Sequence, residues 1–181
     1  QGTNSVSYVL SNNCGDVVLT GNTNITAKAG GVAFDVYYWP AGGYSEGVSV
    51  TLDENMTGTI SGTVKYAAGH TATGTDLSQE ANLTILAGTL QGEISTSEAE
   101  HGIAISGGTF SRPVDKSYCA DGFAPADNGD GTYGVKVDGM TGSGTQDKPY
   151  VISDAAGLRT FRDNVNRGID FAGKYIRLDA S

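Results

Sequence analysis

Basic residues are scarce in this chain. Its 11 Lys and Arg face 20 Asp and Glu, which gives a formal net charge of −9 and a pI near 4.5. Proteins that bind nucleic acid or anionic membranes neutralise phosphates with clustered Lys and Arg, whereas the basic residues here are scattered. Neither nucleic acid nor an anionic membrane surface is therefore an expected partner.

Long apolar segments are also missing. The chain has no run of roughly 18 or more apolar residues, so it predicts no membrane-spanning helix. Its N-terminus has no basic stretch followed by an apolar one, so no signal peptide is expected in this sequence. An exported protein whose signal has been removed would look the same.

Cysteine is nearly absent. The two cysteines, Cys14 and Cys119, lie 105 positions apart and form no Cys-x-x-Cys motif, so a zinc site is not predicted. A disulfide between them is one interpretation if the compartment is oxidising. Two free thiols are the simpler one.

What the chain does contain favours strands. Glycine contributes 27 residues, Thr, Ser, Val and Ile recur, and the helix-favouring Leu, Glu and Lys are few. This composition is typical of short strands separated by tight turns. A length of 181 residues suits one ordinary domain, or one domain and a fragment of another.

A repeat with an offset of 20 residues indicates how the strands are arranged. LTILAGTL at 83–90 aligns with IAISGGTF at 103–110, and looser copies occur at 17–26 and 59–64. Alternating apolar residues inside each copy predict strands, and a period of 20 to 50 residues is typical of solenoids. We therefore expect an all-β fold, a parallel β-helix of about five coils over residues 1–110. A β-sandwich of short Greek-key strands is the alternative.

One segment resembles a known group of proteins. ISGGTFSRPVDKSYCADGFAPADNGDGTYGVKV at 105–137 has an ISGGTFS start, a centre with Tyr118, Ala120, Gly122 and Phe123, and a DNGDGTY turn. It is similar to a segment of large surface-exposed repeat proteins of gut bacteria. In those proteins it follows the last coils of a right-handed, pectate-lyase-like parallel β-helix. The resemblance implies that fold and an extracellular or bacterial cell-surface location.

The acidic, glycine-rich part of this segment invites comparison with a calcium loop. If Gly131 takes the glycine position of an EF-hand loop, the first and last ligand positions fall on Ala126 and Val137, whose side chains cannot bind calcium. Asn-Gly and Asp-Gly between alternating apolar residues instead predict a β-hairpin. Residues 111–137 are thus expected to cap the rod, with an irregular calcium site at Asp127 and Asp130 as the weaker interpretation and no other cofactor expected.

The character of the sequence changes after the hairpin. Residues 138–147 have the composition of a linker, and residues 148–181 predict a strand, a helix and a second strand. The helix is expected to begin near Ser153 or Asp154 and to end at Gly168, with Leu158, Phe161 and Val165 on one face. This unit resembles the first segment of a following β-helical module in the same kinds of surface protein, which implies that it is truncated here.

The densest group of titratable residues is Glu98, Glu100 and His101. The group lies between two copies of the repeat, where a solvated turn is expected. No nucleophile elbow, phosphate loop or metal-ligand pattern accompanies it in the sequence. We therefore predict no catalytic residue.

Aromatic residues gather at 32–47. If the strand that begins at Val32 turns Tyr38 inward, then Tyr37 and Trp39 point outward. These two residues and Tyr44 could contact a glycan or a protein, because exposed Trp and Tyr offer flat apolar faces with polar edges. The alternative is that this segment folds over the rod and buries its own rings.

The resemblance and the lack of a catalytic pattern favour a non-enzymatic module of a larger bacterial surface protein. Its expected role is a stalk or an adhesion element, with a host glycan or surface protein as partner. The module is expected to be a monomer. The alternative is a fragment or auxiliary module of a carbohydrate-active enzyme, a polysaccharide lyase or a glycoside hydrolase, because fold does not decide function.

Overall fold

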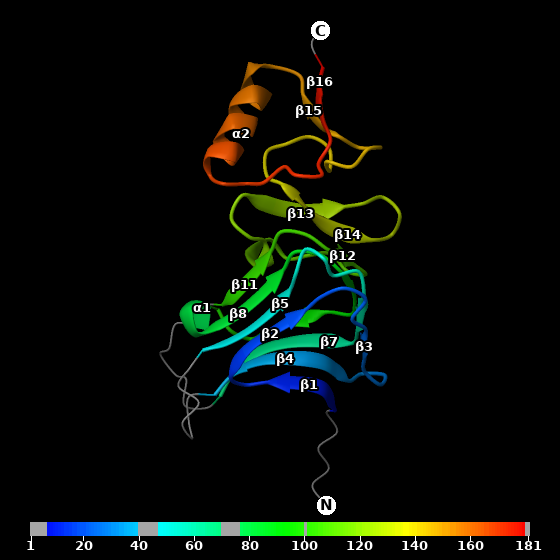
Figure 1. The fold of residues 1–181 in the computed structure, drawn as a ribbon, viewed down its shortest axis with the longest axis vertical. Helices are drawn as coiled ribbons and strands as arrows, with labels where there is room; N and C mark the ends of the chain where they lie inside the picture. The colour runs from blue at the N-terminus through cyan, green and yellow to red at the C-terminus, as the bar shows by residue number, and fades with distance from the viewer. Residues whose placement is uncertain (1–6, 40–46, 70–76, 100, 180–181) are drawn as a thin grey trace, which may run out of the picture.

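The computed structural model describes residues 7–39, 47–69, 77–99 and 101–179. It is mostly β, and its strands are stacked along the long axis of the molecule (Figure 1). The N-terminal strands lie at one end, the hairpin of β13 and β14 lies in the middle, and the helix α2 lies at the other end.

The first twelve strands in the described residues form three sheets, and each sheet takes every third strand of the chain. One sheet contains β1 (Tyr8–Asn12), β4 (Val32–Tyr38), β7 (Thr63–Ala68) and β10 (Ile94–Ser95). The second contains β2 (Gly15–Leu19), β5 (Val48–Leu52), β8 (Ala81–Ile85) and β11 (Gly102–Ile105). The third contains β3 (Ile25–Thr26), β6 (Thr59–Ser61), β9 (Thr89–Gln91) and β12 (Thr109–Phe110).

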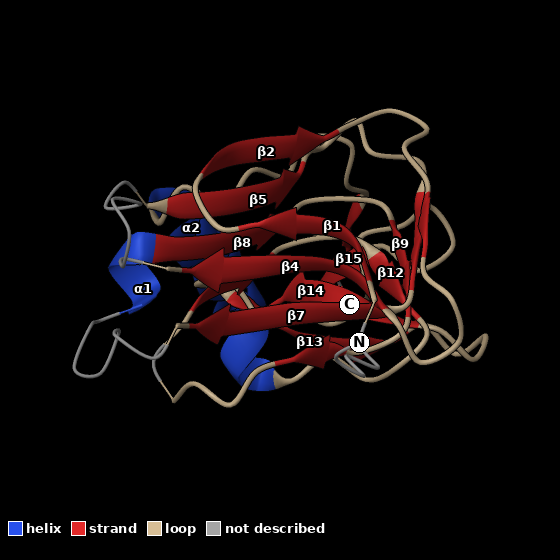
Figure 2. Ribbon diagram, turned by 90° about the horizontal axis from the view of Figure 1, so that it is seen from below, coloured by secondary structure: helices blue, strands red, loops and turns tan. Residues whose placement is uncertain are grey.

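These twelve strands pair with their neighbours in parallel. A Greek-key sandwich, the alternative that the strand spacing also allowed, would pair its strands antiparallel. The parallel pairing agrees instead with a chain that returns to the same sheet after every third strand. Seen from the N-terminal end, β2, β5 and β8 lie above β4 and β7, and β9 and β12 lie to their right (Figure 2).

The sequence repeat corresponds to the register of these sheets. Leu83 pairs with Ile103, Ile85 with Ile105, and Leu90 with Phe110, as the 20-residue offset predicts. The paired residues are buried in one hydrophobic core to which all three sheets contribute. The repeat therefore places like apolar residues on top of one another in successive layers.

The predicted hairpin is confirmed. The strands β13 (Phe123–Asp127) and β14 (Tyr133–Val137) pair antiparallel, and Tyr133 of β14 pairs with Phe110 of β12. Gly129 and Gly131 of the turn have positive φ angles. The Asn-Gly and Asp-Gly pairs place glycine, which adopts such angles readily, at both positions. The short 3-10 helix at Lys116–Tyr118 precedes the hairpin, and Val135 packs against the core at this end.

The predicted strand, helix and strand are also present at the C-terminal end. They are β15 (Tyr150–Ile152), α2 (Ala155–Asn166) and β16 (Ile176–Leu178), and the two strands pair in parallel. The Asp154 side chain caps α2 by accepting a hydrogen bond from the Gly157 N–H at 2.7 Å, and Gly168 follows the helix with a φ of 88°. A shorter helix, α1, spans Leu77–Glu80.

The packing of this unit differs from the expectation in two respects. Leu158 and Val165 of the predicted apolar face are 54% and 46% exposed, and Phe161 of that face packs on a second hydrophobic cluster. Met140, in the segment with linker composition, is buried in this same cluster. Residues 138–147 thus contribute to the C-terminal core, where the Val151 N–H donates to the Thr141 carbonyl at 2.9 Å.

Candidate functional site

The titratable group predicted to lie in a solvated turn has structural contacts instead. The Ala68 N–H donates to Glu98 Oε1 at 3.4 Å, while the ring of His101 lies edge-on between Tyr66 and Tyr118 at centroid distances of 6.2 and 5.3 Å. The His101 Nδ1 atom is buried and has no hydrogen-bond partner among the described residues. Glu100 lies outside the described residues, and no hydrogen bond joins Glu98 to His101 in the part of the chain that is described.

Two of the three predicted aromatic ligand residues lie together. The rings of Tyr37 and Trp39 are stacked, with centroids 5.8 Å apart and an interplanar angle of 22°, and both side chains are half-buried. The Trp39 ring also lies directly over the Cα of Gly69, where a Cβ would clash with it. Tyr38 is buried as the alternation predicts, and Tyr44 lies outside the described residues.

Asp127 and Asp130, the weak calcium candidates, stabilise the hairpin turn. Asp127 accepts from the Gly129 N–H at 2.8 Å, and Asp130 accepts from the Thr132 N–H at 2.9 Å and the Thr132 hydroxyl at 2.6 Å. The hydrogen bonds from the Thr132 hydroxyl and N–H lower the pKa of Asp130. Within the described residues, no group of three or more His, Cys, Asp or Glu side chains could hold a metal ion.

Both cysteines are free thiols in the structure. Cys14 is exposed, and Cys119 is partly buried, with its Sγ 3.6 Å from the Asp115 carbonyl oxygen to which it donates. Burial raises the pKa of the Cys119 thiol, which lowers its reactivity at neutral pH.

A large hollow among the described residues was not predicted from the sequence. It is a crevice of about 1390 Å³ between the stacked sheets, the hairpin and the C-terminal unit. Its floor consists of the turns at 86–89 and 106–109, its wall is the hairpin, and segments 142–148 and 167–174 line its far side. We refer to it as the hairpin crevice.

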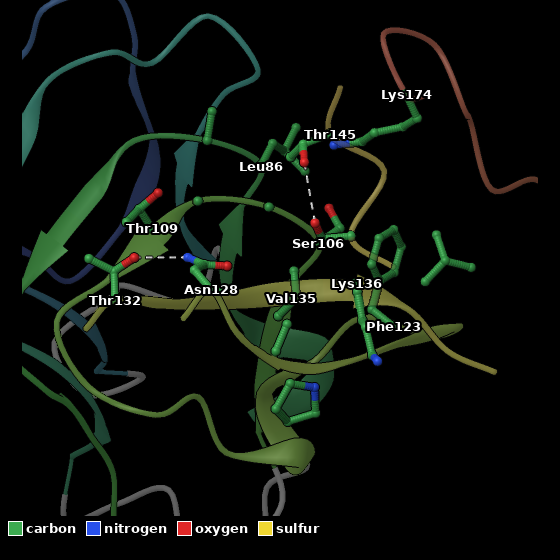
Figure 3. Close-up of a pocket in the computed structure, with 18 of the residues that line it drawn as sticks. Leu86, Ser106, Thr109, Phe123, Asn128, Thr132, Val135, Lys136, Thr145 and Lys174 are labelled. Carbon is green, nitrogen blue, oxygen red and sulfur yellow. Dashed lines mark hydrogen bonds between the residues drawn. The ribbon is translucent and has the colours of Figure 1, made fainter. Parts of the chain in front are cut away.

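The walls of the hairpin crevice combine apolar and hydroxyl groups. In Figure 3, Thr109, Asn128 and Thr132 lie toward one side of the view, and Leu86, Ser106 and Thr145 toward the other. Phe123 and Val135 come from the hairpin strands. Because these residues are spread from the coil turns to the C-terminal unit, no local motif in the sequence could reveal them together.

The charges in the crevice nearly balance. The lining contains five carboxylates and four basic side chains: Asp121, Asp127, Asp130, Asp147 and Asp170, and Lys136, Lys148, Arg167 and Lys174. The Lys148 Nζ donates to the Asn128 carbonyl at 2.9 Å, and Arg167 donates to Asn164 at 3.0 Å. The crevice is thus polar without a strong charge of either sign.

A buried carboxylate, Asp35, lies outside the hairpin crevice. Asp35 of β4 is only 4% exposed and lies between Ser11 of β1 and Lys65 of β7 in register. It accepts a hydrogen bond from the Asn12 N–H at 3.0 Å. Burial raises its pKa above the ordinary 3.8, although hydrogen bonds from Ser11 and Asn12 and the charge of Lys65 oppose the shift.

This raised pKa predicts a pH-dependent effect of Asp35→Asn. The folded state holds the Asp35 proton more tightly than the unfolded state, so the stability from this group is present below pH 3.8 and is lost as pH rises through the folded-state pKa. Urea unfolding at a series of pH values should therefore show the free energy of unfolding of the variant increasing relative to that of the wild type as the pH rises above 3.8. A difference that does not change with pH would contradict this assignment.

Asp35→Ala is the matched control, because it removes the acceptor as well as the charge. The Asn12 N–H then loses its partner, and we expect a loss of about 1–3 kcal/mol in the free energy of unfolding.

Comparisons of the chain with protein-family models, with curated proteins and with solved structures found no match. Among the helices of the described residues, none has the length and apolar character needed to cross a lipid bilayer. The function is therefore inferred from the sequence and the structure of this protein.

Proposed function

We propose that the chain is a non-enzymatic module of a larger bacterial cell-surface protein, with a stalk or adhesion role. In this proposal the three parallel sheets form a right-handed parallel β-helix that the hairpin of residues 111–137 caps. Residues 148–181 begin a following module. A host glycan or a surface protein is the expected partner, and the module acts as a monomer outside the cell.

The observation that carries the proposal is the return of the chain to the same sheet after every third strand. Stacked layers of this kind can be added or removed without altering those already present, because each contacts only its neighbours. Such an architecture suits a protein part that has to span a distance. The antiparallel hairpin supports the capping role, since it pairs with the last parallel strand of its sheet, β12.

The contacts of the titratable residues support a non-catalytic role. Glu98 accepts a backbone hydrogen bond, His101 packs between two tyrosines, and Asp127 and Asp130 stabilise a turn. An acid and base pair needs two such groups directed toward one substrate position. Each of these side chains instead has a partner or a packing contact within the protein.

Protease treatment of intact cells of the source bacterium tests the surface location. We expect peptides from this module to appear in the supernatant before the cells lyse, with a cytoplasmic protein as the negative control. Detection of these peptides only after lysis would refute the proposal.

Recognition through the aromatic pair is tested separately. A glycan array is probed with the wild type and with Tyr37→Ala and Trp39→Ala variants, because stacked rings offer apolar faces to sugars. If the pair binds a glycan, signals on the array should fall in both variants while the melting temperature shows that they are folded. Equal signals from all three proteins would exclude the pair as the binding site.

A further inference from the structure

We propose that the hairpin crevice binds a neutral polysaccharide chain. The inference concerns a different surface from the Tyr37 and Trp39 pair. It deepens the adhesion role of the proposed function, on which its biological meaning rests, but the binding itself can be tested on the isolated module.

The first argument comes from the arrangement of hydroxyl groups on the crevice floor. Thr89 of β9 and Thr109 of β12 both line the crevice and pair in register in neighbouring parallel strands. Their backbones are therefore about 4.8 Å apart. No hydrogen bond from either hydroxyl, or from that of Ser106, to another described residue is present. Hydroxyls repeated at such a spacing suit a linear ligand that itself carries repeated hydroxyl groups.

The second argument comes from the apolar side chains that line the same crevice. Phe123 and Pro125 of β13 line the crevice and are partly buried, and Leu86 is 37% exposed in the coil turn. Pyranose rings have one or two apolar C–H faces bordered by hydroxyls, so they pack on flat apolar side chains while their edges form hydrogen bonds. The crevice thus offers both kinds of contact that a sugar needs.

The third argument concerns charge. Five carboxylates and four basic side chains line the crevice, so its formal charge is −1, that is, four minus five. A polyanion would have to approach these carboxylates and a protein with a net charge of −9. Repulsion of this kind lowers both association rate and affinity. A neutral chain encounters neither problem.

The crevice is also built on ordered backbone. The Thr109 N–H donates to the Gly88 carbonyl at 2.9 Å, and the Thr89 N–H donates to the Gly58 carbonyl at 3.1 Å. The strands β13 and β14 are paired over five residue positions. A preformed surface loses little conformational entropy on binding, which favours affinity for flexible ligands such as polysaccharides.

A peptide that adds a strand to the sheet is a less suitable occupant. The edge strand of this sheet on the hairpin side is β13, and Pro125 lies at its middle. Proline has no N–H to donate to an added strand, so it weakens edge-to-edge pairing at this position.

Native affinity electrophoresis of the whole chain tests the inference. The gels contain galactomannan, xyloglucan, mixed-linkage β-glucan or mannan as neutral probes, and polygalacturonate as the acidic probe. We expect at least one neutral polysaccharide to retard the wild type. Retardation by none of the four neutral probes, or by polygalacturonate alone, would overturn the proposal.

Isosteric variants locate the site. Thr89→Val with Thr109→Val removes both hydroxyls but keeps the branched shape, and we expect the affinity for the retarding probe to fall about tenfold or more. Thr59→Val is the matched control, because Thr59 pairs in register with Thr89 but does not line the crevice. Equal retardation of the double variant and the control would place binding elsewhere and overturn the assignment.

Two further variants keep the test decisive. If thermal unfolding shows that the double variant does not fold, Ser106→Ala takes its place. This substitution removes another hydroxyl of the crevice and should also weaken binding. Trp39→Ala should bind as the wild type does, and a loss of binding in this variant would assign the polysaccharide to the aromatic pair instead. Because these gels do not depend on where the parent protein resides, their failure and failure of the surface location remain distinguishable.

Discussion

Replacing Ile85 by Ala is expected to lower the free energy of unfolding by about 2–5 kcal/mol. Ile85 is fully buried, and in register it lies between Leu52 of β5 and Ile105 of β11. Truncation removes apolar contacts in the middle of a stack and leaves a cavity that neighbouring layers on both sides can close only by moving. Chemical unfolding monitored by circular dichroism measures the change.

The adjacent Leu86 supplies the control. It is 37% exposed, so Leu86→Ala should change stability by no more than about 1 kcal/mol. Similar losses in the two variants would contradict the placement of Ile85 in the core and of Leu86 at the surface.

Replacing Gly107 by Ala is expected to destabilise the protein by about 1–3 kcal/mol or more. A Cβ at this position would fall on the carbonyl oxygen of Leu86 in the preceding layer, closer than van der Waals contact allows. Backbone cannot move aside as a flexible side chain can, so the two layers must separate locally. The melting temperature and the urea midpoint of the variant measure the effect.

Gly157→Ala is the matched substitution with the opposite expected sign. Gly157 lies in the first turn of α2, and a Cβ there would meet its nearest neighbour, Asp154 Oδ1, at an ordinary 3.5 Å. Alanine favours the helix over glycine, so a gain of up to about 0.5–1 kcal/mol is expected. If Gly107→Ala proved as harmless as Gly157→Ala, the close stacking of the turns at 86–89 and 106–109 would be refuted.

The pairing of residues in neighbouring strands could be predicted from the sequence, because the offset of the repeat gives the register. Leu83, Ile85 and Leu90 each find the partner that lies 20 residues later. The hairpin could be predicted for a similar reason, since Asn-Gly and Asp-Gly are local signals whose backbone requirements do not depend on distant parts of the chain.

The face by which α2 packs could not be predicted from its apolar residues alone. Asn164 is fully buried, where its side chain donates to the Asp138 carbonyl at 3.4 Å and accepts from Arg167 at 3.0 Å. Arg167 caps the C-terminal end of the helix, whereas Asp138 belongs to a separate segment. The side of the helix that carries Asn164 is therefore buried, and Leu158 and Val165 remain exposed. A helical pattern shows which residues share a face, but tertiary contacts decide which face is buried.

The hairpin crevice was beyond sequence reasoning for a geometric reason. Its floor comes from turns that are stacked in space but separated in the chain, and its far side comes from the C-terminal unit. The dense titratable groups at 98–101 and 127–130 are visible in the sequence, but Glu98, Asp127 and Asp130 accept hydrogen bonds from backbone N–H groups. Asp127 and Asp130 do border the crevice, but the groups that make up its floor and far side lie elsewhere in the chain and have no local signal.

The central claim, that successive layers of parallel strands form the body of the protein, is tested most directly by nuclear Overhauser contacts between backbone protons. Thr84 of β8 pairs with Thr51 of β5 and Ala104 of β11, so we predict amide-to-Hα contacts along this series without strong Hα-to-Hα contacts. The antiparallel hairpin of β13 and β14 should give the Hα-to-Hα contacts in the same spectrum and serve as an internal control. Strong Hα-to-Hα contacts among β5, β8 and β11 would contradict the account, because only antiparallel neighbours bring those protons together.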